Sequence, residues 1–402
     1  MSAPSLDLKG RIPKLDGLRG IAIGLVLMHH YFFQAIDTRP ATIFSYLQAA
    51  GRLAWSGVDL FFVLSGFLIG GILLDARKSS NYFRVFYTRR FFRIIPLYFA
   101  FLAIVFCLSA LGRFGVTSDF LWMFQNRLPW LPHFFFLQNF WMAAYTSLGA
   151  IGLTVTWSLA IEEQFYLTLP PLVRFLSPRL LAYALAAGIL LAPASRIALH
   201  AFAPSHHLAW FALMPCRADA LLLGVLGAAL LRDEWWKLWL EKNRRLLLFV
   251  LVPLAVGLAI LTRRSPDPFG YDMLTVGYSW LALFYLCVLL CALLFRESWF
   301  GACLRWGWLT WLGSIAYGTY LFHDFIRQAL RGLYYSGPPG GSTPIQIAIS
   351  VLALVLTLGL CRLSWVFFEK PLIQIGHRTR YEFREREVPE ATVSLSPEEG
   401  TA

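Results

Sequence analysis

Long runs of apolar residues dominate this chain and limit what it can fold into. Many runs are close to 20 residues long, which is the length that an α-helix needs to cross the hydrocarbon core of a bilayer. Only 14% of the 402 residues are charged, whereas about a quarter is usual in soluble proteins. Because backbone groups inside a bilayer must be hydrogen-bonded within the spanning structure, such runs favour helices. We therefore predict an all-α, polytopic membrane protein.

About ten transmembrane helices are expected from the positions of these runs. Lys and Arg are concentrated in alternate connecting segments, and the positive-inside rule places those segments and both termini in the cytoplasm. We predict a membrane domain over residues 1–375. Residues 376–402 are charged and contain proline, which indicates a flexible cytoplasmic tail. The predicted spans are Gly17–Ile36, Trp55–Leu74, Phe91–Leu111, Thr156–Phe175, Leu181–Leu199, Arg217–Leu231, Leu246–Leu261, Leu274–Phe295, Leu309–Leu330 and Ile345–Phe368.

The third connecting segment, about residues 112–155, is long and aromatic. We expect it to hold a re-entrant or interfacial helix that covers the outer face. The alternative is an eleventh, broken span.

Arg19 and His30 share the first predicted span and are eleven positions apart. Eleven residues of α-helix return to within about 20° of the starting direction, and they cover roughly 16 Å along the axis. A cation at the mouth of a membrane helix and an imidazole deep inside it indicate a site that binds an anion and transfers protons.

Five carboxylates fall inside predicted spans at a similar depth below the outer surface: Asp59, Glu162, Glu163, Asp219 and Asp324. Each buried charge costs roughly 2.5–3.5 kcal/mol on insertion scales. The carboxylates must therefore be paired, protonated or exposed to a wet cavity, and we predict a shared cavity on the outer side.

Arg90 and Arg93 open the third span on the inner side, three positions apart on one helix face. Two guanidinium groups in this arrangement can hold a phosphate. The alternative is that they only enforce topology, as basic loops usually do. We interpret the net charge of +12 in the same way, and we expect no nucleic-acid partner.

No pattern in the chain calls for a metal. The six cysteines form no C-x-x-C motif, so neither a disulfide framework nor a zinc site is indicated. The motifs of common soluble enzymes, such as G-x-S-x-G, the P-loop and H-E-x-x-H, are missing from the sequence.

Seven segments, taken in order, resemble acyltransferase family 3, a family of integral-membrane bacterial O-acyltransferases. Together they extend over residues 15–372, nearly the whole membrane region. The segments are LDGLRGIAIGLVLMHH (15–30), SGVDLFFVLSGFLIGG (56–71), YTRRFFRIIPLYF (87–99), TWSLAIEEQFYL (156–167), RADALLLGVLGA (217–228), SIAYGTYLFHDFI (314–326) and FFEKPL (367–372).

The resemblance implies a multi-pass protein of the cell inner membrane that transfers an acyl group, usually acetyl, from cytosolic acyl-CoA to a hydroxyl. The implied acceptor is a carbohydrate, a lipid-linked glycan or a glycosylated metabolite. The family's Arg-x10-His signature maps onto Arg19 and His30, and its Arg-x-x-Arg signature maps onto Arg90 and Arg93. Some members carry a fused hydrolase-like domain, which we do not expect here.

Acyl transfer to an alcohol needs a base for the hydroxyl proton and an anchor for the donor's phosphates. We predict that His30 is the base, and that Arg19, Arg90 and Arg93 bind the phosphates of acyl-CoA. His29 serves as a comparison, since it lies about 80° away from the face of Arg19.

We assign other polar residues either to orienting the catalytic base or to contacting the acceptor. Asp59, Glu162 or Glu163 would orient His30, and the two glutamates lie 100° apart, so at most one faces the site. Contact with the acceptor is predicted for Arg217, Asp219 and His323.

Three alternatives remain open from the sequence. His30 could carry the acyl group itself as a nucleophile. The chain could transport a glycan or an organic anion without any acyl transfer. It could also be a non-enzymatic component of an export complex.

Overall fold

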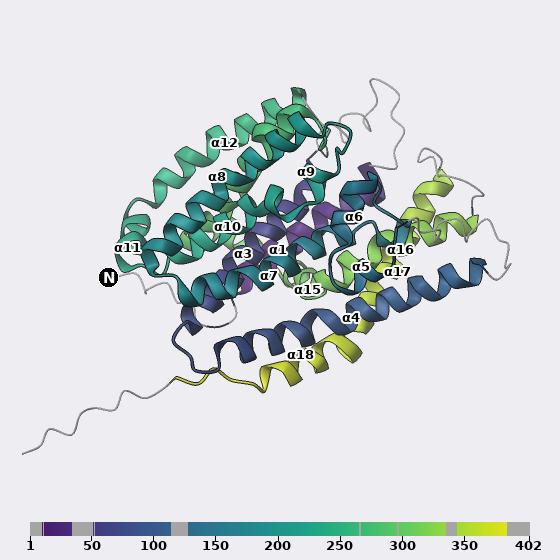
Figure 1. Ribbon diagram of the computed structural model, residues 1–402, viewed down its shortest axis with the longest axis horizontal. Helices are drawn as coiled ribbons and strands as arrows, with labels where there is room; N and C mark the ends of the chain where they lie inside the picture. The colour runs from purple at the N-terminus through teal and green to yellow at the C-terminus, as the bar shows by residue number, and fades with distance from the viewer. Residues whose placement is uncertain are drawn as a thin grey trace, which may run out of the picture.

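The computed structural model describes residues 10, 12–33, 51, 53–113, 128–264, 267–295, 297–334 and 344–383. Within these ranges the chain forms helices and no strand. The long helices form one bundle, with α1 (Pro13–Met28), α3 (Gly57–Ala76) and α10 (Met214–Leu230) near its middle (Figure 1). The other helices are η1 (His29–Phe33), η2 (Ala54–Ser56), α4 (Tyr82–Arg113), α5 (Leu131–Phe134), α6 (Gln138–Tyr145), η4 (Ile151–Leu153), α7 (Thr156–Phe175), α8 (Pro178–Phe202), α9 (Ala209–Ala212), α11 (Glu234–Lys242), α12 (Arg244–Arg264), η5 (Met273–Gly277), α13 (Tyr278–Leu294), α14 (Trp299–Leu304), α15 (Gly307–Ser314), α16 (Ala316–Tyr334), α17 (Pro344–Ser364), η6 (Trp365–Glu369) and α18 (Lys370–His377).

Seven helical segments of the described chain are long and apolar enough to cross a membrane. They confirm the prediction of an all-helical, multi-pass membrane protein, while the count of ten spans and the cytoplasmic position of the termini stay predictions. Large apolar side chains remain exposed on the outer helices α8, α12 and α17, as lipid contact requires. The seven segments are Ala54–Ala76, Tyr82–Leu111, Pro178–Phe202, Ala209–Leu230, Arg244–Arg264, Met273–Leu294 and Pro344–His377.

The other three predicted spans are helical but do not meet the same length and hydropathy limits. They correspond to α1 with η1, to α7, and to α15 with α16. These helices carry His30, Glu162, Glu163 and His323, so the polar side chains expected of a buried site also lower the hydropathy of the segments that hold them. The predicted ninth span is moreover two helices, because the chain breaks at Ile315 between α15 and α16.

Close packing of α3 against α10 fixes the centre of the bundle. A Cβ atom added to Gly66 would lie 1.9 Å from the carbonyl oxygen of Leu221, and one added to Gly224 would lie 2.2 Å from that of Val63. Only glycine allows the two backbones to approach so closely, which is the small-residue packing typical of membrane helices.

The described part of the third connecting segment contains α5 and α6, both too short to cross a bilayer. Their polar side chains point inward: the amide of Gln138 donates to the carbonyl of Thr156 at 2.9 Å, and Asn139 donates to the carbonyl of Ala212 at 3.1 Å. His133 is fully buried, and this burial lowers its pKa to about 4. The described part of the segment therefore packs against the bundle and contains no membrane-spanning helix. Residues 114–127 of the predicted loop lie outside the described residues.

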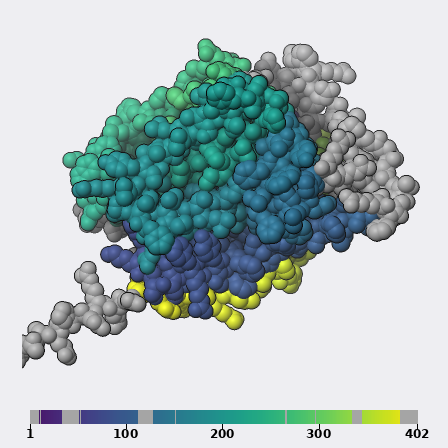
Figure 2. Space-filling view, in the orientation of Figure 1, coloured from purple at the N-terminus to yellow at the C-terminus, as the bar shows by residue number. Residues whose placement is uncertain are grey.

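The C-terminal part of the described chain lies along α4. Figure 1 shows α18 beside α4, and Figure 2 shows the yellow C-terminal residues at the edge of the molecule against the blue of α4. The backbone N–H of Ser80 donates to the carbonyl of Glu382 at 2.9 Å, and the side-chain amide of Asn81 donates to the carbonyl of Arg380 at 3.0 Å. The structure thus places the first part of the predicted tail, up to Phe383, against the helical bundle; residues 384–402 lie outside the described residues.

Candidate acyl-transfer site

A cavity of about 510 Å³ lies between α1, α3, α4, α7, α16 and α18. We call it the main cavity. It follows α3 from Val58 to Ile72, a distance of about 21 Å at the helical rise of 1.5 Å per residue. Apolar side chains of α3 form one long wall, and polar groups gather near the two ends. A long, narrow ligand with a charged end would fit such a space.

Three arginines from two helices meet at one end of the main cavity. Arg19 of α1 and both Arg90 and Arg93 of α4 line it. Arg19 also forms an ion pair with Asp16 at 3.1 Å, and the Arg90 guanidinium lies 5.6 Å from the centre of the Tyr166 ring. The structure thus brings together all three residues that the sequence assigned to phosphate binding. Guanidinium groups converging on one space can bind a phosphate through charge-assisted hydrogen bonds.

The neighbouring Arg89 is held differently. Its Nε and Nη2 donate to the carbonyl of Thr379 at 3.2 and 2.7 Å, and its guanidinium lies 5.1 Å from the centre of the Tyr381 ring. Arg89 therefore fastens the C-terminal segment to α4, and that segment brings His377 to the wall of the main cavity. Sequence reasoning missed His377, because a charged stretch after the last apolar run has no local signal for packing.

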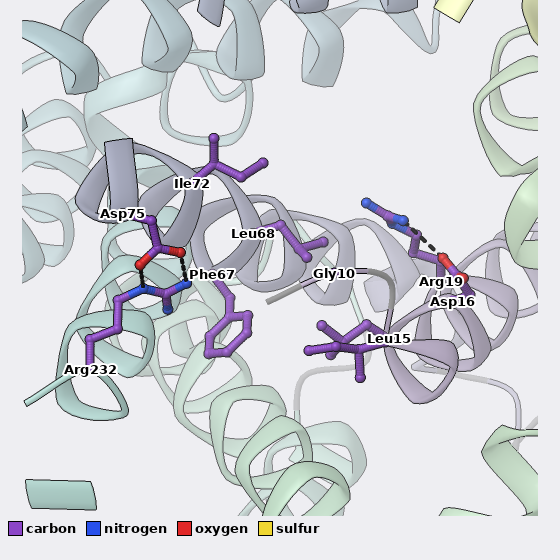
Figure 3. Close-up of a pocket in the computed structure, with 10 residues that line it drawn as sticks. Gly10, Leu15, Asp16, Arg19, Phe67, Leu68, Ile72, Asp75 and Arg232 are labelled. Atoms are coloured by element: carbon purple, nitrogen blue, oxygen red, sulfur yellow. Dashed lines mark hydrogen bonds and ion pairs between the residues drawn. The ribbon is translucent and has the colours of Figure 1, made fainter. Parts of the chain in front are cut away.

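A smaller space of about 240 Å³ adjoins this basic end. We call it the side pocket. It shares Arg19, Leu68 and Ile72 with the main cavity, and it is also lined by Asp75 of α3 and by Arg232, which follows α10. Figure 3 shows the Asp75–Arg232 and Asp16–Arg19 ion pairs on opposite sides of the pocket.

Glu162 lines the main cavity, whereas Glu163 does not. The structure therefore answers the question of which of the two glutamates faces a cavity, as expected from their separation of 100° on α7. Near Glu162, the hydroxyls of Ser65 and Tyr166 lie 2.6 Å apart. A further carboxylate, that of Glu369, also lines the cavity and accepts a hydrogen bond from Ser364 at 3.0 Å.

The opposite end of the main cavity is formed by Ser158 and Tyr320, whose hydroxyls lie 2.5 Å apart. His323 lies directly behind them, with ring centres 5.8 Å from Tyr320 and 4.9 Å from His30. His30 itself does not line the cavity. His323 does not line it either, but its ring contacts that of Tyr320, which does, whereas the ring of His30 contacts that of His323.

His30 lies in η1, a π-helical turn that follows α1. The regular α-helix ends at Met28, before His30. The α-helical spacing that predicted Arg19 and His30 on one face therefore does not extend to His30. π-Helical turns are rare and are frequently found at functional sites.

His323 is fully buried, and its Nδ1 lies 2.7 Å from the carbonyl oxygen of Tyr320. A carbonyl accepts hydrogen bonds, so Nδ1 carries the proton in this contact. Nε2 then has its lone pair available, and among the described residues it has no hydrogen-bond partner. An imidazole in this state can accept a proton.

Three of the five carboxylates predicted to share one outer cavity are instead paired with arginines. Asp59 lies 2.5 Å from Arg217, both of them about 1% exposed. Asp219 pairs with Arg196 at 3.0 Å. A buried charge without a counterion is costly, and in these two pairs the arginine compensates the charge of the carboxylate.

The remaining pair joins Asp324 to Arg327 at 2.7 Å, one turn apart on α16. The Asp59–Arg217 pair corrects one prediction, and the contact of Arg217 and Asp219 with the acceptor stays a prediction. Asp59 bonds to Arg217 and not to His30, and neither Arg217 nor Asp219 lines either of the two spaces described above.

Comparison with known proteins identifies the family of the chain. The family model of the acyltransferase domain, acyltransferase family 3, matches residues 12–364. The chain belongs to this family. No solved structure matches it.

Curated relatives of this acyltransferase-family chain include the O-acetyltransferase OatA of Staphylococcus aureus (strain NCTC 8325 / PS 47), 25% identical over 390 residues. The match covers 91% of this chain and 58% of the relative. The putative peptidoglycan O-acetyltransferase YrhL of Bacillus subtilis (strain 168) is 28% identical over 401 residues, covering 92% and 56%. The chain thus spans less than two thirds of the length of these relatives.

The position of each residue relative to the family motifs explains why the basic end was predicted and two of the ion-pair partners were not. Arg19, Arg90 and Arg93 fall within the quoted family motifs, which a sequence displays directly. The partners Arg196 and Arg327 fall outside the quoted motifs. For Arg327, the spacing of three from Asp324 on one helix was an available signal.

Proposed function

We propose that this protein is a membrane O-acyltransferase that moves an acetyl group from acetyl-CoA to a hydroxyl of a carbohydrate. The observation that carries the proposal is the main cavity, which has three arginines at one end and Ser158 and Tyr320 at the other, with the His323–His30 pair next to Tyr320. Anion binding and proton transfer are the two demands that a CoA thioester and an alcohol place on a catalyst.

In this proposal the donor enters at the basic end. Arg19, Arg90 and Arg93 bind the diphosphate, and the pantetheine arm follows the apolar wall of α3 toward Ser158 and Tyr320. The length of that wall, about 21 Å, suits an extended arm, and its mostly apolar side chains limit the water around the arm. Hydrolysis of the thioester competes with transfer, so a dry channel favours transfer to the acceptor.

At the opposite end an imidazole takes the proton of the acceptor hydroxyl. The alcohol oxygen attacks the thioester carbonyl, a C–O bond forms and the C–S bond breaks. The proton then passes from the imidazolium to the CoA sulfur, which leaves as the thiol, so the protein ends unchanged. Tyr320 and Ser158 provide hydroxyl donors for the negative charge that develops on the carbonyl oxygen.

Two histidines are available for the proton transfer. Nε2 of His323 has a lone pair and its ring contacts Tyr320 of the cavity wall, while the ring of His30 contacts that of His323. We assign the general base to this pair and place His30 behind His323, where it accepts or returns the proton. In the alternative, His30 carries the acetyl group as a covalent intermediate. Incubation with labelled acetyl-CoA, without acceptor, leaves label on the protein only in that case.

The proposed acceptor is a glycan of the cell envelope. YrhL is named as a putative peptidoglycan O-acetyltransferase. OatA of Listeria monocytogenes, 32% identical over 167 residues that make up 40% of this chain, is named as a peptidoglycan O-acetyltransferase. Peptidoglycan is therefore the first acceptor to test. Mass spectrometry of envelope glycans from a deletion strain and its parent should show the loss of one acetyl group per modified sugar. Unchanged glycans in the deletion strain would argue against this acceptor.

The direct test uses purified protein in liposomes with labelled acetyl-CoA and glycan fragments. We expect labelled ester to form, and we expect His323→Ala and His30→Ala to lower its rate by at least about 100-fold, the lower end of general-base effects. His29→Ala is the matched control, because His29 neighbours His30 in η1 but has no ring contact with His323 among the described residues. Passage of acetyl-CoA or glycan across the bilayer without any ester would refute the proposal.

A further inference from the structure

The side pocket branches from the main cavity at Arg19. The two spaces share Arg19, Leu68 and Ile72, so a ligand that reaches this arginine from the main cavity has a second space on the other side of it. Its volume of about 240 Å³ is too small for a whole acyl-CoA but sufficient for one compact part of it.

The pocket combines apolar walls with polar groups at two sides. Leu15, Phe67, Leu68 and Ile72 supply the walls, and Figure 3 shows them between the Asp75–Arg232 pair and the Asp16–Arg19 pair. A flat aromatic base suits such a space, because its faces contact apolar side chains while its edge forms hydrogen bonds.

Arg232 has hydrogen-bonding capacity to spare. Its Nε and Nη2 each donate to a carboxylate oxygen of Asp75 at 2.7 Å, and Nη1 donates to the carbonyl of Ala228 at 3.2 Å. A guanidinium carries five N–H donors, so these three bonds leave two that can bind a ligand. The Arg232 side chain is 19% exposed, so a ligand from solution can reach it.

We propose that the side pocket binds the 3′-phosphorylated adenosine of the donor. The inference rests on the proposed function, since it assumes that the diphosphate lies at Arg19 and the pantetheine arm in the main cavity. With those two parts placed, the nucleoside must lie on the opposite side of Arg19. Arg232 then binds the 3′-phosphate, and a carboxylate at the rim accepts a hydrogen bond from the amino group of adenine.

The inference separates two ways of binding CoA. If the nucleoside extends into solvent, the protein recognises only the diphosphate and the arm. If it occupies the side pocket, removing the nucleoside from the donor costs affinity, and changes in the pocket matter only for the complete donor.

The experiment crosses donor with variant in the reconstituted full-length protein. The donors are acetyl-CoA and S-acetyl-4′-phosphopantetheine, which lacks the 3′-phosphoadenosine. The variants are Arg232→Ala and Asp75→Asn, and Arg179→Ala is the control, because Arg179 is exposed at the start of α8 and lines neither space. We expect Arg232→Ala to lower kcat/KM for acetyl-CoA about tenfold, the effect of losing one charged hydrogen bond. Arg232→Ala should leave kcat/KM for the truncated donor unchanged, and Arg179→Ala should change kcat/KM for neither donor.

An equal loss for both donors would overturn the inference, because it would mean that Arg232 acts on the fold. An unchanged kcat/KM for acetyl-CoA in Arg232→Ala would overturn it as well. A second measurement is independent of turnover: adenosine 3′,5′-bisphosphate should bind directly to the wild-type protein and about tenfold more weakly to Arg232→Ala.

The two proposals fail separately in this design. Absence of bisphosphate binding refutes the side pocket as a nucleotide site even if acetyl transfer occurs. Absence of acetyl transfer from either donor refutes the proposed function, while bisphosphate binding that depends on Arg232 would still assign a nucleotide to the pocket.

Discussion

The pairing of Asp59 with Arg217 allows a structural role to be separated from a catalytic one. The carboxylate and the guanidinium are both about 1% exposed, and the bond between them is 2.5 Å long. The Arg217 guanidinium also lies 3.7 Å from the centre of the Tyr278 ring. A cation over a ring gains about 2 kcal/mol when desolvated, which is less than the cost of leaving a buried charge without its counterion.

We therefore expect Asp59→Asn to destabilise the protein by about 3–5 kcal/mol, the usual cost of breaking a buried ion pair on one side. The double variant Asp59→Leu with Arg217→Met removes both charges. It should cost less than Asp59→Asn alone, because a well-packed apolar pair is often neutral or stabilising relative to a buried ion pair. Equilibrium unfolding in mixed detergent micelles, followed by circular dichroism, measures both values.

Acetyl transfer by the folded double variant then decides the role of Asp59. If Asp59 acts only through Arg217, the double variant keeps most of its activity. A variant that is stable but inactive would refute the structural role and restore Asp59 as an orienting group for the catalytic histidines. Equal stability of wild type and Asp59→Asn would refute the energetic reasoning itself.

Other predictions concern the donor end, the central packing and acid stability. Arg90→Ala should raise the KM for acetyl-CoA at least about tenfold with a smaller effect on kcat. The Arg89 guanidinium binds the C-terminal segment, so Arg89→Ala should raise this KM less than Arg90→Ala does. A larger increase in KM for Arg89→Ala would contradict the assignment of Arg90 to the donor site. Gly66→Ala should prevent stable folding, because the added Cβ would lie 1.9 Å from a backbone oxygen of α10; yield of monodisperse protein after detergent extraction tests this. Burial lowers the pKa of His133 to about 4, below its unfolded value, so the unfolded state binds the proton first as the pH falls. Lowering the pH from 7 to 5 should therefore cost wild type about 2 kcal/mol more stability than His133→Gln, as measured by unfolding at each pH.

Much of the fold was predictable because hydropathy and helix length are local properties. Each predicted span corresponds to a helical segment, although the ninth is divided at Ile315. The break comes at a short turn between two apolar helices, where composition does not change. The π-helical turn at His30 was equally invisible, because it depends on hydrogen-bond register and not on residue type.

The site was predictable where function requires charges close together in the sequence. Arg90 and Arg93 share a helix face, and the main cavity unites them with Arg19. The partners of Asp59 and Asp219 were not predictable, since those contacts depend on tertiary packing between distant helices. The common depth of these carboxylates in the membrane stays a prediction, and depth alone does not say which neighbour each one meets.

The Asp59–Arg217 contact joins residues 158 positions apart in the chain, and this separation has a consequence for biogenesis. During translation α3 emerges with its carboxylate long before α10 supplies the guanidinium. The translocon, or an accompanying insertase, must therefore shelter an incomplete bundle until the sixth predicted span is nearly synthesised. Nascent chains halted before residue 217 should remain associated with that machinery, and release into the lipid phase should begin only after α10 has left the ribosome.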